Sequence, residues 1–162
     1  MKIYLIRHPQ TVRNLDNVLT GWELSLYSKT GKIQFRKIMN YFEGIELQVY
    51  SSDLPRALKL GKAISINTKS KLHVSKLIRE RNFKKTEPKT HYETDSEFGK
   101  RVLRFTNKFE FKRGIIVAHA GSIKKLIDYW IPNDKLNLNC PRDIIFKIET
   151  IKNRNKLIKI KV

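Results

Sequence analysis

Short runs of apolar residues alternate along the chain with longer stretches in which apolar residues recur at helical spacing. The short runs, typical of buried strands, cover residues 2–6, 47–50, 72–74 and 114–118. The longer stretches, typical of amphipathic helices, cover residues 31–42, 54–66, 97–109 and 122–130. Two later runs, 144–148 and 157–162, predict a closing pair of strands. This order predicts an α/β fold, a three-layer sandwich whose mostly parallel central sheet carries helices on both faces.

Local signals mark where three of these helices begin. Ser28 or Thr30 can cap the first helix, and Thr94 or Asp95 can cap the helix over 97–109. Pro55 lies in the first turn of the second helix, where a proline is tolerated. These signals agree with the boundaries that the apolar pattern predicts.

The length and charge of the chain limit the number of domains and the kinds of partner that it can have. Its 162 residues suit one domain over 1–162. Lysine and arginine number 34 against 15 acidic residues, and the formal net charge of +19 favours an anionic partner. Phosphorylated small molecules, nucleic acid and anionic membrane surfaces all fit. Because the basic residues are spread along the whole chain, a solvated surface without a dedicated partner explains the charge equally well.

The sequence carries no sign of export or membrane insertion. Cys140 is the only cysteine, which excludes an intramolecular disulfide and a four-cysteine zinc site. The apolar run at 1–6 is too short for the hydrophobic part of a signal peptide. The longest uncharged apolar stretch, 114–123, is about half of the roughly 20 residues that a membrane span needs. We therefore expect a cytoplasmic protein without a membrane segment.

Polar residues suited to phosphate chemistry follow three of the predicted strands. Arg7 and His8 follow the first strand; Arg56 comes shortly after the second, and His119 follows the fourth. Because ligands of α/β sheets bind beyond the carboxyl ends of the strands, these side chains should meet there. Guanidinium groups bind phosphate oxygens in pairs, and a neutral imidazole of either histidine can attack phosphorus. Backbone N–H groups at the next helix start, including that of Ala120, can face the same anion.

Four segments form an ordered set of motifs around these residues. They are Leu-Ile-Arg-His-Pro-Gln-Thr-Val-Arg-Asn at 5–14, Ser-Ser-Asp-Leu-Pro-Arg-Ala at 51–57, Ile-Arg-Glu-Arg-Asn-Phe at 78–83 and Val-Ala-His-Ala-Gly at 117–121. Together they resemble the histidine phosphatase superfamily, in its phosphoglycerate mutase-like branch. The resemblance implies the phosphoglycerate mutase-like form of the α/β sandwich and a short phosphatase member of the family.

The resemblance implies a role for each matching residue. His8 would be the nucleophile that becomes a phosphohistidine, and Glu80 would act as general acid and then as general base. The phosphate pocket would be lined by Arg7, Asn14, Arg56 and His119. No metal and no cofactor are implied, which agrees with the lack of a metal-binding motif in the sequence. Aromatic residues near the motifs, Trp22, Phe83 and Tyr92, can form a substrate wall.

The sequence departs from the usual family pattern at Pro9, Gln10 and Lys84. Pro9 resembles the α-ribazole phosphatase-like members, a branch linked to cobalamin assembly. This departure favours α-ribazole 5′-phosphate as the substrate.

The assignment of the general acid has alternatives. Arg79 and Arg81 flank Glu80, and nearby positive charge favours the ionised form of a carboxylate, which opposes proton donation. Glu87 or Glu93 can therefore be the proton donor instead.

The predicted function is hydrolysis of a small phosphorylated metabolite. The family's mutases carry extra segments that close over the site, whereas only a short loop follows the acidic motif here, and a site open to water should hydrolyse its intermediate. One alternative is a protein phosphohistidine phosphatase, since short family members do that work. Another is a catalytically weak protein of the same fold whose basic surface binds nucleic acid or another polyanion. The sequence gives no oligomeric state.

Overall fold

A mixed six-stranded sheet forms the centre of the molecule. The computed structural model describes residues 1–16, 19–83, 92–108, 113–132 and 139–162. Its strands are β1 (Lys2–Arg7), β2 (Val49–Ser52), β3 (Leu72–Ser75), β4 (Arg113–Ala118), β5 (Ile144–Ile151) and β6 (Arg154–Lys161). They lie in the order β3-β2-β4-β1-β5-β6. The first four strands run parallel, whereas β5 pairs antiparallel with β1 and β6 antiparallel with β5. The predicted α/β fold is confirmed, and the closing pair of strands makes the sheet mixed.

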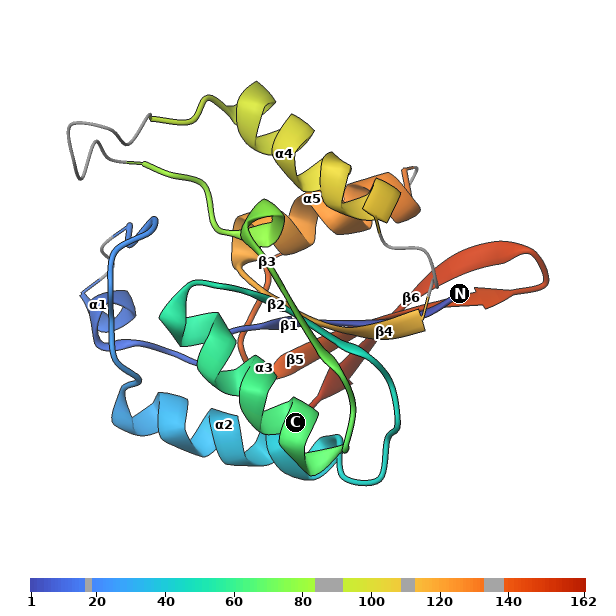
Figure 1. Cartoon of the computed structure of the whole chain (residues 1–162), viewed down its shortest axis with the longest axis horizontal. Coiled ribbons are helices and arrows are strands. Elements are labelled where there is room, and N and C mark those ends of the chain that lie inside the picture. Colours follow the sequence, from blue (N-terminus) through green and yellow to red (C-terminus); the bar gives the residue numbers. More distant parts are fainter. Residues whose placement is uncertain (17–18, 84–91, 109–112, 133–138) are drawn as a thin grey trace.

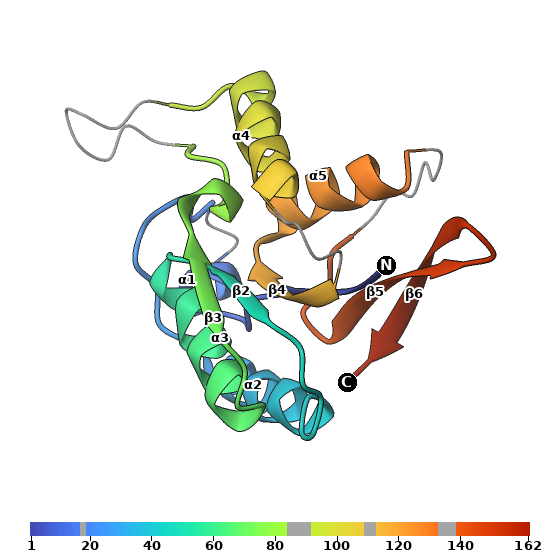
Figure 2. The same ribbon diagram turned by 45° about the vertical axis from the view of Figure 1, so that its right-hand side comes forward.

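Helices cover both faces of this sheet (Figure 1, Figure 2). One face carries α2 (Lys29–Tyr41) and α3 (Pro55–Asn67), and the other carries α4 (Asp95–Lys108) and α5 (Ala120–Trp130). A short helix, α1 (Val12–Leu15), follows β1, and a 3₁₀ turn, η1 (Lys76–Ile78), follows β3. The three-layer arrangement expected from the sequence is therefore present. No helix in the described ranges is long and apolar enough to cross a membrane.

Strand β1 explains why the parallel strands appear in the sequence as uninterrupted apolar runs. Ile3 and Leu5 pack on the α4–α5 side, in the same cluster as Phe98. Tyr4 and Ile6 pack on the α2–α3 side. Successive side chains of a strand point to opposite faces, so a strand covered on both faces must be apolar throughout.

Side-chain caps fix the starts of two helices. The hydroxyl of Ser28 accepts the backbone N–H of Gly31 at 3.0 Å, so α2 begins two residues before the predicted start. Thr94 and Glu97 cap α4 reciprocally: the Thr94 hydroxyl accepts the N–H of Glu97 at 3.2 Å, and the Glu97 carboxylate accepts the N–H of Thr94 at 2.8 Å. Pro55 opens α3, as predicted.

The predicted boundaries of β2 are two residues too early. The N–H of Leu47 bonds to the carbonyl of Ile45 in a turn, so the strand has not yet begun there. Ser51 and Ser52 continue the pairing with β3 although both are polar. Both serines are buried because they lie where the sheet meets the candidate site.

The closing hairpin is longer than predicted. Its strands extend to Ile151 and Arg154, and the two residues between them, Lys152 and Asn153, have φ of 49° and 60°. Such left-handed positions form the tight turns that join antiparallel strands. Phe109, the predicted end of the helix over 97–109, lies outside the described residues.

Candidate active site

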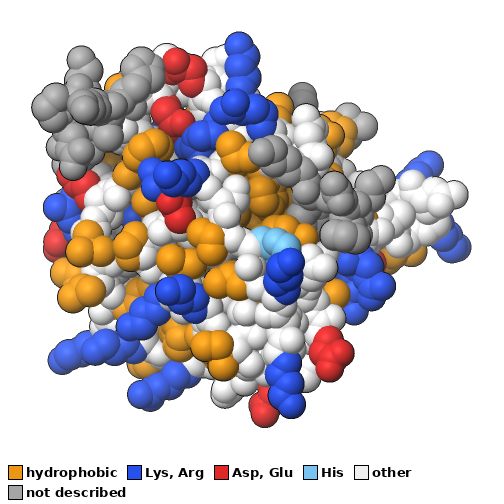
Figure 3. Space-filling view, viewed as in Figure 1, with side chains coloured by type: hydrophobic (Ala, Val, Ile, Leu, Met, Phe, Trp, Pro, Cys, Tyr) orange, Lys and Arg blue, Asp and Glu red, His pale blue; other side chains and the backbone are white. Residues whose placement is uncertain are grey.

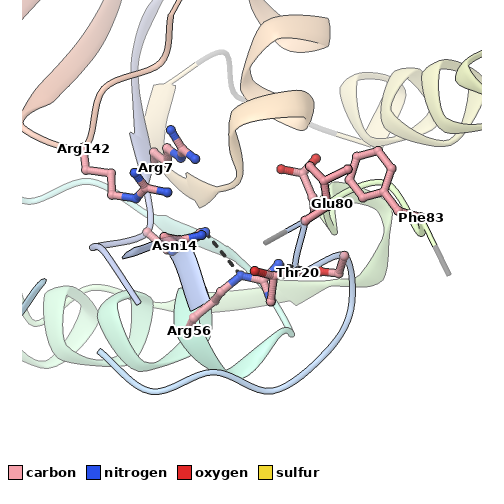
Figure 4. Close-up of a pocket in the computed structure, with 10 residues that line it drawn as sticks. Arg7, Asn14, Thr20, Arg56, Glu80, Phe83 and Arg142 are labelled. Carbon is pink, nitrogen blue, oxygen red and sulfur yellow. Dashed lines mark hydrogen bonds between the residues drawn. The ribbon is translucent and has the colours of Figure 1, made fainter. Parts of the chain in front are cut away.

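One pocket lies beyond the carboxyl ends of β1 and β2, where the sequence predicts chemistry. It has a volume of about 250 Å³ (Figure 4). Its lining residues come from six separate segments of the chain: Arg7, His8, Asn14, Leu19, Thr20, Gly21, Arg56, Glu80, Phe83 and Arg142. The structure therefore brings together six of the residues that the sequence singled out, and adds four that it did not.

His8 is buried in this pocket with its two ring nitrogens in different environments. Its Nδ1 lies 2.8 Å from the carbonyl oxygen of Pro9. Its Nε2 lies 3.2 Å from Nε of Arg56, which can only donate. This pairing assigns the imidazole proton to Nδ1 and the lone pair to Nε2. The departure at Pro9 leaves the arrangement intact, because only the carbonyl of that residue is used.

The imidazole of His8 is held in its neutral form. Burial lowers its pKa well below the ordinary value, and the guanidinium groups of Arg56, Arg7 and Arg142 lower it further. The hydrogen bond to Pro9 opposes these effects without cancelling them. A neutral imidazole is the form that can attack phosphorus.

Backbone carbonyls hold the guanidinium groups of Arg56 and Arg7. Arg56 donates from Nη2 to Gly21 at 2.6 Å and from Nη1 to Glu23 at 3.1 Å. Gly21 has a φ of +51°, a left-handed turn conformation that suits glycine and presents its carbonyl to Arg56. Arg7 donates from Nη1 to the carbonyl of Cys140 at 2.8 Å, while its buried Nε has no hydrogen-bond partner among the described residues. Burial lowers the pKa of Arg56 to about 10, so the group stays charged at neutral pH.

His119 lies beside His8 but does not line the pocket. The two ring centroids are 5.1 Å apart, and His119 is fully buried at the start of α5, which opens at Ala120. Its Nε2 lies 2.9 Å from the hydroxyl of Ser52. Within the described part of the chain, its Nδ1 has no partner. Burial, followed by the charge of Arg56, lowers the pKa of His119 well below its ordinary value.

Glu80 faces the pocket from the opposite side (Figure 4). Its carboxylate accepts the N–H of Arg81 at 3.0 Å and that of Gly121, at the start of α5, at 3.3 Å. A side chain at Gly121 would collide with this carboxylate. The first turn of α5 therefore holds Glu80 through one backbone donor, the N–H of Gly121.

The two arginines that flank Glu80 are engaged elsewhere. Arg79 forms a bidentate pair with Asp53, with distances of 2.7 and 2.5 Å, and its guanidinium lies 4.5 Å from the ring centroid of Trp22. Arg81 donates from Nε to the carbonyl of Glu93 at 2.9 Å. The sequence could not indicate this, because both partners are distant along the chain.

Of the two alternative acids, Glu93 is bound to Arg101. Its carboxylate lies 2.6 and 2.8 Å from Nε and Nη2 of Arg101 and accepts the N–H of Asn82 at 3.0 Å. Burial alone would raise the pKa of Glu93, but these hydrogen bonds outweigh it and hold the pKa below its ordinary value. Glu93 is not a lining residue of the pocket. Glu87, like Lys84, lies outside the described residues.

The predicted aromatic wall is present only in part. Phe83 lines the pocket, with Leu19 as a second apolar neighbour. Trp22 instead donates from Nε1 to the carbonyl of Glu80 at 2.7 Å, and the hydroxyl of Tyr92 accepts from Arg81 at 3.1 Å. Neither of these two aromatic residues lines the pocket.

The unusual residue Gln10 has a structural partner. Its side-chain oxygen accepts the hydroxyl of Ser28 at 2.7 Å, and its backbone N–H donates to Gln34 at 2.9 Å. This departure from the family pattern therefore ties the loop after β1 to the start of α2.

Arg142 is the charged residue among the four lining residues that the sequence analysis missed. It precedes β5, whose Ile145 pairs with Ile6 of β1. Because β5 runs antiparallel to β1, its beginning lies at the carboxyl end of β1, beside His8. The only signal in the sequence would have been the direction of that strand.

An α/β sandwich with a buried neutral imidazole between guanidinium groups is typical of an enzyme that acts on phosphate groups. A family model of the histidine phosphatase superfamily (branch 1) matches residues 3–114. The chain therefore belongs to the histidine phosphatase superfamily, and its activity class is that of a phosphatase. Among the described residues, no three His, Cys, Asp or Glu side chains gather closely enough to hold a metal ion.

Solved structures share the fold across nearly the whole chain. The α-ribazole phosphatase of Shigella flexneri has a TM-score of 0.82 and 18% identity, covering 100% of this chain and 96% of that one. A phosphoglycerate mutase of Bacillus anthracis has a TM-score of 0.80 and 19% identity, covering 99% and 92%. A phosphoserine phosphatase of Entamoeba histolytica has a TM-score of 0.74 and 20% identity, covering 99% and 96%. No curated protein sequence matches the chain.

Proposed function

We propose that the protein hydrolyses phosphomonoesters through a phosphohistidine formed on His8. The observation that carries the proposal is the pair of contacts around this imidazole. Pro9 holds Nδ1, and Arg56 lies against Nε2, so the lone pair of Nε2 is next to the guanidinium that would bind the phosphoryl group. The contact between Arg56 and Nε2 would be exchanged for one to a phosphoryl oxygen when substrate binds.

The first step transfers the phosphoryl group to the enzyme. Nε2 of His8 forms a bond to phosphorus while the bond from phosphorus to the ester oxygen breaks. Glu80, in its protonated form, gives its proton to the departing oxygen, which leaves as an alcohol. Arg7 and Arg56 stabilise the charge of the phosphoryl oxygens in the transition state. Asn14, which lines the pocket, supplies a further donor to those oxygens, and the same role is assigned to His119, whose ring centroid lies 5.1 Å from that of His8.

The second step is hydrolysis. The Glu80 carboxylate, left ionised by the first step, takes a proton from a water molecule that attacks the phosphohistidine. The bond between phosphorus and Nε2 breaks, and phosphate leaves. His8 is then neutral and Glu80 is again protonated, so the cycle balances.

The substrate proposal is a small phosphorylated metabolite. Pro9 and the fold shared with the Shigella enzyme support α-ribazole 5′-phosphate as the first compound to test. A polyanion-binding role has less support, because Lys and Arg side chains are dispersed over the face seen in Figure 3 rather than gathered there. A phosphohistidine protein belongs in the same substrate panel.

The test is to trap the phosphoenzyme. Enzyme mixed with a radiolabelled phosphomonoester should yield a protein-bound label that is labile in acid and stable in base, and EDTA should not diminish turnover. His8→Ala should form no label, whereas the matched control His73→Ala, on β3 outside the pocket, should form it normally. A label that persists in His8→Ala would refute the mechanism.

A further inference from the structure

Arg142 adds a third guanidinium to the pocket, on the side away from the acid. It lies on the same side as Arg7, whereas Glu80 and Phe83 lie across the pocket (Figure 4). Its position, in the turn before β5, is set by the antiparallel pairing of β5 with β1. None of the four motifs includes it.

Among the described residues, no acidic side chain is paired with Arg142. Its Nε is buried and has no hydrogen-bond partner in the part of the chain that the structure describes. Burial, followed by the like charges of Arg7 and Arg56, lowers the pKa of Arg142 to about 10. Burial also lowers the pKa values of Arg7 and Arg56, but there the negative charge of Glu80 raises them again in part. A charged group held in this way destabilises the free protein unless a ligand compensates it.

The charge balance of the proposed reaction indicates what that ligand is. When Glu80 carries the proton that it must deliver, its own charge is absent. Three guanidinium groups then face a phosphomonoester dianion, and one positive charge is left over. Because Arg7 and Arg56 flank the nucleophile, the uncompensated group is Arg142.

We infer that Arg142 binds a second anionic group, a carboxylate or a phosphate, carried by the same substrate close to the ester. A guanidinium suits this task because its paired N–H groups match the two oxygens of such an anion. The inference rests on the proposed function and narrows its substrate class. Phosphomonoesters of uncharged alcohols, α-ribazole 5′-phosphate among them, become the poorer substrates, so the inference replaces the substrate suggested above with an acidic one.

A matched pair of substrates tests this inference. Glycerol 3-phosphate and 3-phosphoglycerate differ only in a hydroxymethyl group and a carboxylate. The wild type should favour 3-phosphoglycerate in kcat/KM by about 10- to 100-fold, the usual effect of a hydrogen-bonded charge pair. Arg142→Met should reduce that preference at least about tenfold. Arg104→Met, an exposed arginine on α4, should leave the preference unchanged.

Two results would overturn the inference. One is a wild type that does not prefer the carboxylate, and the other is an Arg142→Met loss that is equal on both substrates, which would place Arg142 on the transferred phosphoryl group. Failure of the proposed function has a different signature, since His8→Ala would then retain activity on both compounds.

A melting experiment tests the absence of an internal partner. Arg142→Met keeps most of the aliphatic stem and removes the repelled charge, so the ligand-free variant should melt at the wild-type temperature or above it. A clear drop in melting temperature would mean that Arg142 has a structural partner, and would also overturn the inference.

Discussion

Arg101, beneath the acid segment at residues 79–82, and Arg142, in the arginine cluster around His8, are held in opposite ways. Beneath the acid segment, Arg101 is bound by the Glu93 carboxylate and donates to the carbonyls of Leu77 at 2.8 Å and Glu80 at 3.1 Å. In the cluster, the buried Nε of Arg142 has no hydrogen-bond partner among the described residues. An arginine whose donors are all satisfied internally fixes the backbone around it, whereas one left unsatisfied in a pocket is available to a ligand.

The largest effect should come from removing the satisfied arginine. Arg101→Met leaves the Glu93 carboxylate buried without its partner, which should lower the free energy of unfolding by about 3–5 kcal/mol. Because Glu80 loses a bond to its backbone, kcat should fall more than KM rises. Urea denaturation and steady-state kinetics measure both, with Arg104→Met of the same helix as control. A variant as stable as the wild type would contradict the comparison.

The second-largest effect should come from the cluster around His8. It concerns the dependence of the free energy of unfolding on pH. His8 and His119 have pKa values well below the ordinary 6.5, so between pH 6.5 and their folded pKa values the unfolded chain binds protons that the folded chain does not. Stability should therefore fall as pH drops below 6.5, by up to about 1.4 kcal/mol per pH unit for each histidine. Urea titrations from pH 7.5 to 5 measure this slope. His8→Gln should reduce it, and an unchanged slope would contradict the assignment.

A smaller effect is expected at the edge of the acid segment. Asp53→Asn weakens the bidentate pair with Arg79, whose guanidinium also lies over Trp22. The free energy of unfolding should fall by about 1–2 kcal/mol, since the pair is only partly buried. If Asp53→Asn changes neither the free energy of unfolding nor kcat, Arg79 does not help to position Glu80.

The smallest effect should come from an exposed ion pair that joins α4 to α5. Lys125 lies 2.7 Å from Asp95, whose side chain is 66% exposed. Water screens such pairs, so Asp95→Asn should change the free energy of unfolding by less than about 1 kcal/mol. If Asp95→Asn lowered the free energy of unfolding as much as Arg101→Met does, burial would not distinguish the strong ion pair of Arg101 from the weak one of Lys125.

Much of the fold was predictable, because strands buried on both faces and helices buried on one leave distinct apolar periods. The meeting of Arg7, His8 and Arg56 also followed, since Arg7 ends one parallel strand, His8 follows it, and Arg56 lies in the first turn of the helix after another. Arg142 could not be predicted in the same way. Its place depends on the direction in which β5 pairs with β1, and that is a property of the folded sheet rather than of any local segment.

The partners of the acid segment were equally hidden from the sequence. Trp22, Tyr92 and Glu93 all bind groups within residues 79–82, from positions more than ten residues away. A residue's type indicated that it could bind, but not whether a substrate or another part of the chain would be the partner. The roles proposed for His119 and Glu80 stay predictions until the variants are measured.

Strand β6 gives part of the positive charge a use that has nothing to do with catalysis. It is the outer strand of the sheet, eight residues long, and one side of its backbone pairs with no other strand in the described part of the chain. Lysines at 156, 159 and 161 lie along it, and charged side chains on an open edge discourage a second chain from adding its own strand there. On this edge the basic residues protect the protein against aggregation.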